Sequence, residues 1–278
     1  MKHPGVTAFV LGGGGKWGAV EVGMLQALDE GGIQPDLVLG TSIGAFNGSV
    51  VASSPGRVGV ERLTALWEEI SESGLLRGEF LQQMKSVATL QPAIQGSHAI
   101  RHALEAVHGA DAQIDDLELP FQCVAAQIET ASEHWFDSGP LVDALLASSA
   151  IPAIFPPVEI GGKHYYDGGL VNSVPLTRAV DLGATRIFVL QVGRVESELR
   201  TPERLYEAAL ISFEIARRHR FMTTMANLPE GVEVHLLPSG NPIDFDDRRQ
   251  IRWRKLDETV SLRDTGYRAS ADYLEALK

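Results

Sequence analysis

The sequence predicts an α/β fold in which a largely parallel sheet is covered by helices on both faces. Short runs that are apolar at all but one position, such as residues 6–11 and 187–192, are typical of strands buried on both sides. These runs alternate along the chain with segments whose apolar residues recur at helical spacing. The 278 residues contain no Pro/Ser-rich linker, so we expect one domain over residues 1–278.

The elements are expected in the following order. After the strand at 6–11, the residues Val20, Met24, Ala27 and Leu28 predict a helix that ends at Gly31-Gly32. Further strands are expected at 37–39, 121–128 and 187–192, with a hairpin at 158–166 that turns at Gly161-Gly162. Further helices are expected at 43–51, 141–147, 175–182, 202–226 and 257–277, so the C-terminal part 202–278 is mostly helical.

Charge and composition exclude several classes of protein. Acidic residues number 36 and basic residues 24, and the net charge of −12 argues against a nucleic-acid partner, which requires a basic surface. The only cysteine, Cys123, lies in an apolar run and is expected to be a buried strand residue without chemistry. Four Cys or His ligands at zinc spacing are absent, and we expect neither a metal nor a cofactor. No apolar stretch has the length of a transmembrane helix or of a signal-peptide core, which predicts a cytoplasmic protein.

The pentapeptide Gly40-Thr41-Ser42-Ile43-Gly44 matches the motif G-x-S-x-G. It follows a predicted strand and opens a predicted helix, which is the context of a nucleophile elbow. Gly40 and Gly44 permit unusual backbone angles and close approach. The helix that begins at Ile43 presents a free N–H and a positive dipole to a developing oxyanion. The motif therefore makes Ser42 the candidate nucleophile.

A second glycine-rich segment, Gly12-Gly13-Gly14-Gly15, ends the first strand. Together with Gly18 it also fits G-x-G-x-x-G, a dinucleotide-binding pattern, but that pattern requires an acid at the far end of the second strand. Asp36 lies at the near end of that strand instead. We expect an oxyanion hole, in which N–H groups of Gly13, Gly14 or Gly15 and of Ile43 point at one oxygen.

The third motif is Asp167-Gly168-Gly169, which follows the predicted hairpin. Asp-Gly pairs are common in turns for structural reasons alone, so by itself Asp167 is a turn residue more often than a base.

In this order, the three motifs resemble those of the patatin-like phospholipases, particularly the compact bacterial members. The segment Ala147-Ser148-Ser149-Ala150-Ile151-Pro152-Ala153-Ile154-Phe155-Pro156-Pro157 also resembles the block that precedes the aspartate in that family. The resemblance covers about residues 6–192. It implies a three-layer α/β/α sandwich with a mainly parallel central sheet, and a Ser42–Asp167 dyad that hydrolyses lipid acyl esters through an acyl-enzyme. Gly168 and Gly169 complete the family's Asp-Gly motif.

One position departs from the family pattern. The family usually has arginine or lysine immediately before the glycine that corresponds to Gly18, whereas this chain has Trp17, with Lys16 one residue earlier. Either Lys16 substitutes for the usual cation or the substrate lacks a phosphate. The alternatives to a lipid hydrolase are a carboxylesterase or thioesterase acting on small esters, and a nucleotide-binding regulator that uses the glycine loop.

Two further segments are candidates for contact with substrate or membrane. Residues 75–94 form either a cap over the site or a helical hairpin packed on the core; their apolar members are Leu75, Leu76, Phe80, Leu81, Met84, Val87 and Leu90. A basic patch with one aromatic residue either touches a membrane surface transiently or, as is more common, is a solvated face; it consists of Arg248, Arg249, Arg252, Trp253, Arg254 and Lys255.

Histidine is not expected to take part in catalysis. His164 is expected to point away from the strand face used by Asp167. His219 lies in a charged run on an exposed helix face, and His235 alternates with apolar residues on the polar face of a strand.

Overall fold

The computed structural model describes residues 5–73, 96–152, 155–192, 198–199, 201–202, 205–240 and 256–278. The segment 75–94, expected to form either a cap or a helical hairpin, and the basic patch at 248–255 lie outside these residues. Within the described part of the chain, eight strands form one sheet in the order β5-β6-β3-β2-β1-β7-β8, and β4 pairs with β3.

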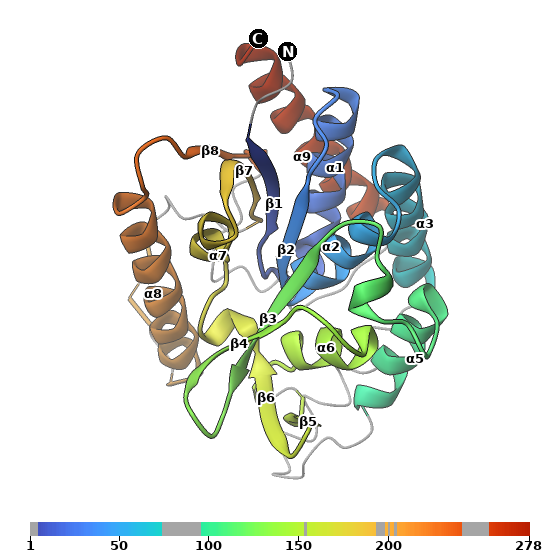
Figure 1. Cartoon of the computed structure of the whole chain (residues 1–278), viewed down its shortest axis with the longest axis vertical. Helices are drawn as coiled ribbons and strands as arrows, with labels where there is room; N and C mark the ends of the chain where they lie inside the picture. Colours follow the sequence, from blue (N-terminus) through green and yellow to red (C-terminus); the bar gives the residue numbers. More distant parts are fainter. Residues whose placement is uncertain are drawn as a thin grey trace.

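The centre of this sheet is parallel and one side of it is antiparallel (Figure 1). The parallel strands are β1 (Val6–Leu11), β2 (Leu37–Thr41), β3 (Phe121–Gln127), β7 (Ala184–Leu190) and β8 (Glu233–Leu236). The antiparallel strands are β4 (Ser132–Phe136), β5 (Val158–Ile160) and β6 (Lys163–Asp167). The expected hairpin is confirmed, with Gly161 and Gly162 at φ +59° and +73° in the turn between β5 and β6.

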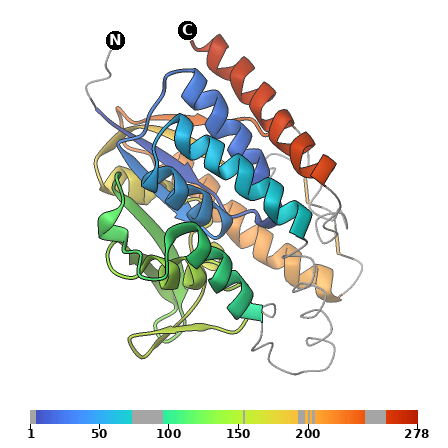
Figure 2. The ribbon, with the colours of Figure 1, turned by 90° about the vertical axis from the view of Figure 1, so that its right-hand side faces the viewer.

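Helices cover both faces of the sheet, which confirms the three-layer α/β/α sandwich (Figures 1 and 2). One face carries α1 (Gly18–Glu30), α2 (Ile43–Ser53), α3 (Arg57–Ser73), α5 (Gly96–His108), α6 (Leu141–Ser148) and α9 (Leu256–Ala276). The other face carries α7 (Leu176–Asp181) and α8 (Leu205–Ala226). Alternate residues of β1 belong to the two apolar clusters, Phe9 and Leu11 to one and Ala8 and Val10 to the other, because successive side chains of a strand point to opposite faces.

Among the α-helices and strands of the described residues, α3, α5 and β4 were not predicted. In α3 the residues Val60, Leu63 and Trp67 are spaced for one helix face, so a signal for this helix was present. In β4 the sequence Ser-Glu-His-Trp-Phe is mostly polar, and only its last residue is buried. Its position as an antiparallel partner of β3 explains the weak apolar pattern, because this strand lies off the main path of the sheet.

The expectation that His235 lies on the polar face of its strand is wrong. The side chain is buried, with 5% of its surface exposed, and its ring stacks on Phe188 of β7 at 4.7 Å between ring centroids. Its Nδ1 lies 3.2 Å from the hydroxyl of Tyr273 in α9. The parallel pairing of β8 with β7 turns His235 into the layer filled by α9, where an aromatic ring with a polar partner packs as well as an aliphatic side chain.

Cys123 is fully buried in β3, as expected, and burial raises the pKa of its thiol. A helix able to span a membrane is not found among the helices of the described part of the chain.

Candidate active site

The three sequence motifs meet where β1 and β2 end at their carboxyl ends, beside the end of the antiparallel strand β6. Thr41 is the last residue of β2 and Ser42 follows it, while Asp167 is the last residue of β6. A Cβ atom at Gly13, after the end of β1, would lie 3.5 Å from Cβ of Ser42. Loops at the carboxyl ends of parallel strands are the usual location of ligand sites in open α/β sheets.

Ser42 occupies a sharp turn between β2 and α2. Its φ and ψ of 56° and −123° place a non-glycine residue in a region that side chains rarely adopt, as a nucleophile elbow requires. The flanking glycines allow the turn because neither has room for a side chain. A Cβ atom at Gly40 would lie 2.4 Å from the Cα of Ala45, and one at Gly44 would lie 2.4 Å from the carbonyl oxygen of Leu11.

Ser42 and Asp167 are in direct contact. The Ser42 hydroxyl donates a hydrogen bond to Oδ2 of Asp167 at 2.6 Å, and the Gly169 N–H donates to Oδ1 at 2.7 Å. Both side chains are buried, each with 7% exposed surface. Burial raises the pKa of Asp167 to about 6, although the two hydrogen bonds oppose that rise. A carboxylate in this state accepts a proton far more readily than an ordinary aspartate does.

Glycine is also required after the aspartate. A Cβ atom at Gly168 would lie 2.2 Å from the carbonyl oxygen of Val124 in β3, so only glycine lets the chain turn against this strand. The turn forms η3 (Gly168–Leu170), whose N-cap is Asp167.

The block around Ser148 holds both members of this pair. Oγ of Ser148 accepts a hydrogen bond from the Ser42 N–H at 3.0 Å, and the carbonyl oxygen of Ala150 accepts one from the Asp167 N–H at 2.9 Å. The sequence singled out this block only through its family resemblance and assigned Ser148 no role. Ser148 ends the mostly apolar helix α6 and is fully buried. A serine at the end of an apolar helical run was therefore the sequence signal that could have pointed to this role.

The structure narrows the set of candidate oxyanion donors. The Gly13 N–H donates to the carbonyl oxygen of Ser173 at 3.1 Å, so it is already engaged. Gly15 has a φ of +56°. Apart from its two chain neighbours, no described atom lies within 4 Å of where its Cβ would be, so the space beside Gly15 is open. Ile43 is the first residue of α2, and the first N–H groups of a helix have no partner within the helix. Gly14, Gly15 and Ile43 remain as the candidates.

Trp17, the departure from the family pattern, lies in η1 (Gly15–Trp17) between the glycine loop and α1. The backbone N–H of Trp17 donates to the carbonyl oxygen of Gly14 at 3.2 Å. Its half-buried side chain packs against the apolar core. The position therefore carries an apolar ring where the family usually carries a cation.

Two histidines considered in the sequence analysis, His164 and His219, are exposed. The Nδ1 of His164 lies 2.7 Å from a carboxylate oxygen of Glu129. His219 is exposed on α8, as expected. Among the described side chains, the one that bonds to Oγ of Ser42 is the carboxylate of Asp167.

The dinucleotide-binding alternative also fails in three dimensions. Asp36, the acid nearest to the position that this pattern requires, accepts a hydrogen bond from the Thr7 N–H at 2.8 Å, near the start of β1. It therefore lies at the opposite end of the strands from the glycine loop.

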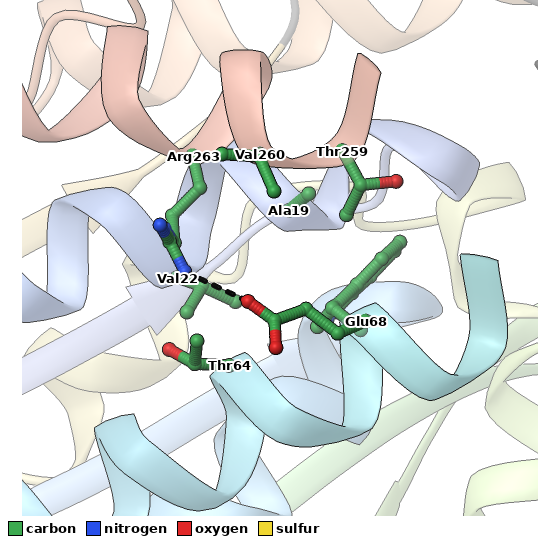
Figure 3. A pocket seen from close by; sticks show the side chains of 8 residues that line it. Ala19, Val22, Thr64, Glu68, Thr259, Val260 and Arg263 are labelled. Atoms are coloured by element: carbon green, nitrogen blue, oxygen red, sulfur yellow. Dashed lines mark hydrogen bonds and ion pairs between the residues drawn. The ribbon is translucent and has the colours of Figure 1, made fainter. Parts of the chain in front are cut away.

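A pocket lies between α1, α3 and α9 (Figure 3). Its wall contains the ion pair between Arg263 and Glu68 at 3.4 Å. The remaining lining residues are Ala19, Val22, Thr64, Trp67, Thr259 and Val260. It contains none of the residues that the three motifs contribute, and we assign it no part in the chemistry.

Comparison with known proteins identifies the family of this chain. The family model for patatin-like phospholipase matches residues 9–180. "Patatin-like phospholipase domain-containing protein ZK370.4" of Caenorhabditis elegans is 35% identical, over 67% of this chain and 14% of that protein. "Lysophospholipase nte1" of Aspergillus terreus is 26% identical, over 98% of this chain and 18% of that protein. The chain thus spans less than a fifth of the length of these curated relatives.

A solved structure shares the fold at low sequence identity. VipD from Legionella pneumophila superposes with a TM-score of 0.52 and 13% identity, over 98% of this chain and 67% of that one, which shows a common fold and no more. The family match covers more than half of the sequence and includes all three motifs. The chain belongs to the patatin-like phospholipase family.

Proposed function

We propose that this protein is a serine acyl-hydrolase that cleaves acyl esters of lipids through a Ser42–Asp167 dyad. The observation that carries the proposal is the 2.6 Å hydrogen bond from the Ser42 hydroxyl to the buried Asp167 carboxylate, at a strand-to-helix turn with positive φ. Activation of a hydroxyl requires a base within hydrogen-bond distance. The carboxylate of Asp167 is such a base, and its raised pKa makes it a better proton acceptor.

Acylation begins when Oγ of Ser42 attacks the ester carbonyl carbon and its proton moves to Oδ2 of Asp167. The tetrahedral intermediate then breaks its bond to the alcohol oxygen, which takes the proton from Asp167 and leaves as a neutral alcohol. The acyl group remains on Ser42 as an ester.

Deacylation repeats these steps with water. Asp167 accepts a proton from a water molecule as its oxygen attacks the acyl-enzyme, and the second tetrahedral intermediate breaks its bond to Oγ of Ser42. The proton returns from Asp167 to Ser42, and the fatty acid is released.

The charge on each tetrahedral intermediate requires fixed donors. We assign this role to the N–H groups of Gly14 or Gly15 and of Ile43, with support from the positive end of the α2 dipole. Loss of one such donor typically lowers turnover about 10²- to 10³-fold.

The substrate class follows from the family and from the names of its members. The Aspergillus relative is called a lysophospholipase, which supports a phospholipid or lysophospholipid substrate. Trp17, in place of a cation, favours a second candidate substrate, a lipid ester without phosphate. Hydrolysis of a series of p-nitrophenyl esters of increasing chain length separates both lipid substrates from small esters.

The decisive experiment is labelling with a fluorophosphonate, followed by peptide mapping. We expect the label on Ser42 in the wild type, no label in Ser42→Ala, and full labelling in Ser49→Ala. Ser49 is a matched control because it is also a buried serine in α2, bonded to the carbonyl oxygen of Phe46 and to His108. A label on another residue, or none on an intact protein, would contradict the proposal.

A further inference from the structure

A buried polar network joins the start of α1 to the first turns of α2. Nδ2 of Asn47 donates to the carbonyl oxygen of Gly18 at 3.0 Å and to Oε2 of Glu21 at 2.7 Å. Nε1 of Trp67, in α3, donates to Oδ1 of Asn47 at 3.0 Å. Both ends of the Asn47 amide are therefore used, and the contacts tie three helices together. We call Glu21, Asn47 and Trp67 the Asn47 network.

Burying this network costs more desolvation free energy than burying apolar side chains would. Glu21 and Asn47 are both fully buried, and Oε1 of Glu21 has no hydrogen-bond partner among the described residues. Burial raises the pKa of Glu21 well above its ordinary value, against the effect of the Asn47 hydrogen bond, and so favours the neutral acid. A buried polar group that is only partly satisfied requires an explanation, because a leucine in its place would avoid the desolvation.

The Asn47 network holds the glycine loop against the start of α2. The Gly18 N–H donates to the carbonyl oxygen of Gly15, and so the loop is continuous with the first turn of α1. Asn47 in turn holds the carbonyl oxygen of Gly18. The two helix starts are in close contact there, since a Cβ atom at Gly18 would lie 2.5 Å from Cγ1 of Ile43. The network thus connects the two parts of the chain that carry the candidate oxyanion donors.

We propose that Asn47, held in place by Glu21 and Trp67, is a positioning residue that sets the separation between the Gly14–Gly15 amides and the Ile43 amide. The inference rests on the proposed function, because this separation matters for rate only if an oxyanion forms between these amides. A displacement of about 1 Å in such an arrangement lowers rates by about 10²-fold. Because the donors act on the transition state, loss of the network lowers kcat and leaves KM nearly unchanged.

The test compares variants of all three network residues with a matched control from α2, the helix of Asn47. Asn47→Leu removes all three hydrogen bonds, Trp67→Phe removes one N–H, and Ser49→Ala removes a buried hydroxyl of α2 that contacts α5 rather than α1. For each we measure kcat and KM with p-nitrophenyl butyrate, the thermal unfolding midpoint, and Ki for an alkyl trifluoromethyl ketone. Ser42 adds to the carbonyl of this ketone and transfers its proton to Asp167, which leaves a hemiketal oxyanion that requires the same donors.

We expect Asn47→Leu to lower kcat at least about tenfold, to leave KM within about twofold, and to raise Ki by the same factor as the fall in kcat. Trp67→Phe should change the same quantities in the same direction by a smaller factor. Ser49→Ala should lower the unfolding midpoint but leave kcat and Ki within about twofold of the wild type. Glu21→Leu should lower kcat, and Glu21→Gln, which keeps an acceptor oxygen for Asn47, should restore most of it.

Different results would overturn the positioning role of Asn47 and the proposed function. A wild type that hydrolyses the ester and binds the ketone, with a folded Asn47→Leu that matches Ser49→Ala in kcat and Ki, would overturn the positioning role alone. If Asn47→Leu does not fold, the same comparison between Trp67→Phe and Ser49→Ala decides. A folded wild type that neither hydrolyses the ester nor binds the ketone would overturn the proposed function, and this inference with it.

Discussion

Two carboxylic acids are buried near the start of α2, and they differ in the hydrogen-bond donors around them. Asp167 receives two hydrogen bonds, one of them from the hydroxyl of Ser42, and burial leaves its pKa at about 6. Glu21 receives one hydrogen bond, from the amide of Asn47, and burial raises its pKa well above the ordinary value. The donor beside Asp167 can give up its proton, whereas the amide beside Glu21 cannot.

Under the proposed function, the neighbour of each acid matters more than burial, which the two acids share. Burial makes both acids better proton acceptors, because it disfavours the charged form. Only Asp167 has a neighbour whose ionisation is useful, since a hydroxyl becomes a nucleophile and an amide does not. On this view Asp167 works by exchanging a proton, and Glu21 works by holding Asn47 in place.

The largest effect should come from substitutions that prevent proton transfer between Ser42 and Asp167. We expect Asp167→Asn to lower kcat about 10⁴-fold, because an amide accepts no proton from Ser42, and Ser42→Ala to lower it at least as far. Steady-state hydrolysis of p-nitrophenyl butyrate measures both. His164→Ala and His219→Ala should remain near the wild type, and a folded histidine variant as inactive as Ser42→Ala would replace the dyad with a triad.

The pH dependence should follow the pKa of Asp167. Below pH 6 the carboxyl is protonated and cannot accept the Ser42 proton, so kcat/KM should fall about tenfold for each pH unit below 6 and level off above it. The rate of fluorophosphonate labelling should have the same midpoint. Circular dichroism at each pH separates titration from acid unfolding. A midpoint near the ordinary value of 3.8 would show that burial does not tune this group.

The same pKa makes Asp167 a source of instability at neutral pH. Its folded pKa exceeds the ordinary value of 3.8, so the stability that the protonated form contributes is complete below 3.8 and is lost as pH rises through about 6. Asparagine does not titrate, and the free energy of unfolding of Asp167→Asn relative to wild type should therefore increase from pH 4 to pH 7, by up to about 3 kcal/mol. Urea unfolding at both pH values measures this gain.

Asp111→Asn is the matched control for that measurement, because Asp111 is exposed and its substitution should give no comparable gain. A gain of equal size at both pH values would mean that Asp167→Asn stabilises the protein for a reason other than the titration of the carboxyl.

The smallest effect should come from substitutions of Trp17, which follows the glycine loop. If the missing cation disfavours phosphate, Trp17→Arg should raise the ratio of lysophospholipid to monoacylglycerol hydrolysis about two- to fivefold, the usual size of an exposed charge interaction. Trp17→Gln removes the ring without adding a charge and should leave the ratio unchanged. Equal ratios in both variants would count against a head-group role for this position.

Much of the site could be predicted from local sequence. Gly40 and Gly44 are needed because backbone atoms occupy the space of their side chains, and a need of this kind leaves a short and recognisable motif. The strands β1, β2, β3 and β7 were predicted from mostly apolar runs, and β8 from alternating apolar and polar residues. In contrast, β4 was not predicted, because only its last residue is buried.

What the sequence by itself determined is therefore most of the elements, the elbow at Ser42 and the identity of the glycines, because these depend on backbone angles and on apolar periodicity. Only the tertiary structure decided which groups meet. It brings Asp167 to Ser42 across 125 positions of the chain, engages the Gly13 N–H with Ser173, and places His235 in the core and Asn47 between three helices. These contacts depend on the register and packing of distant segments, which no local pattern encodes.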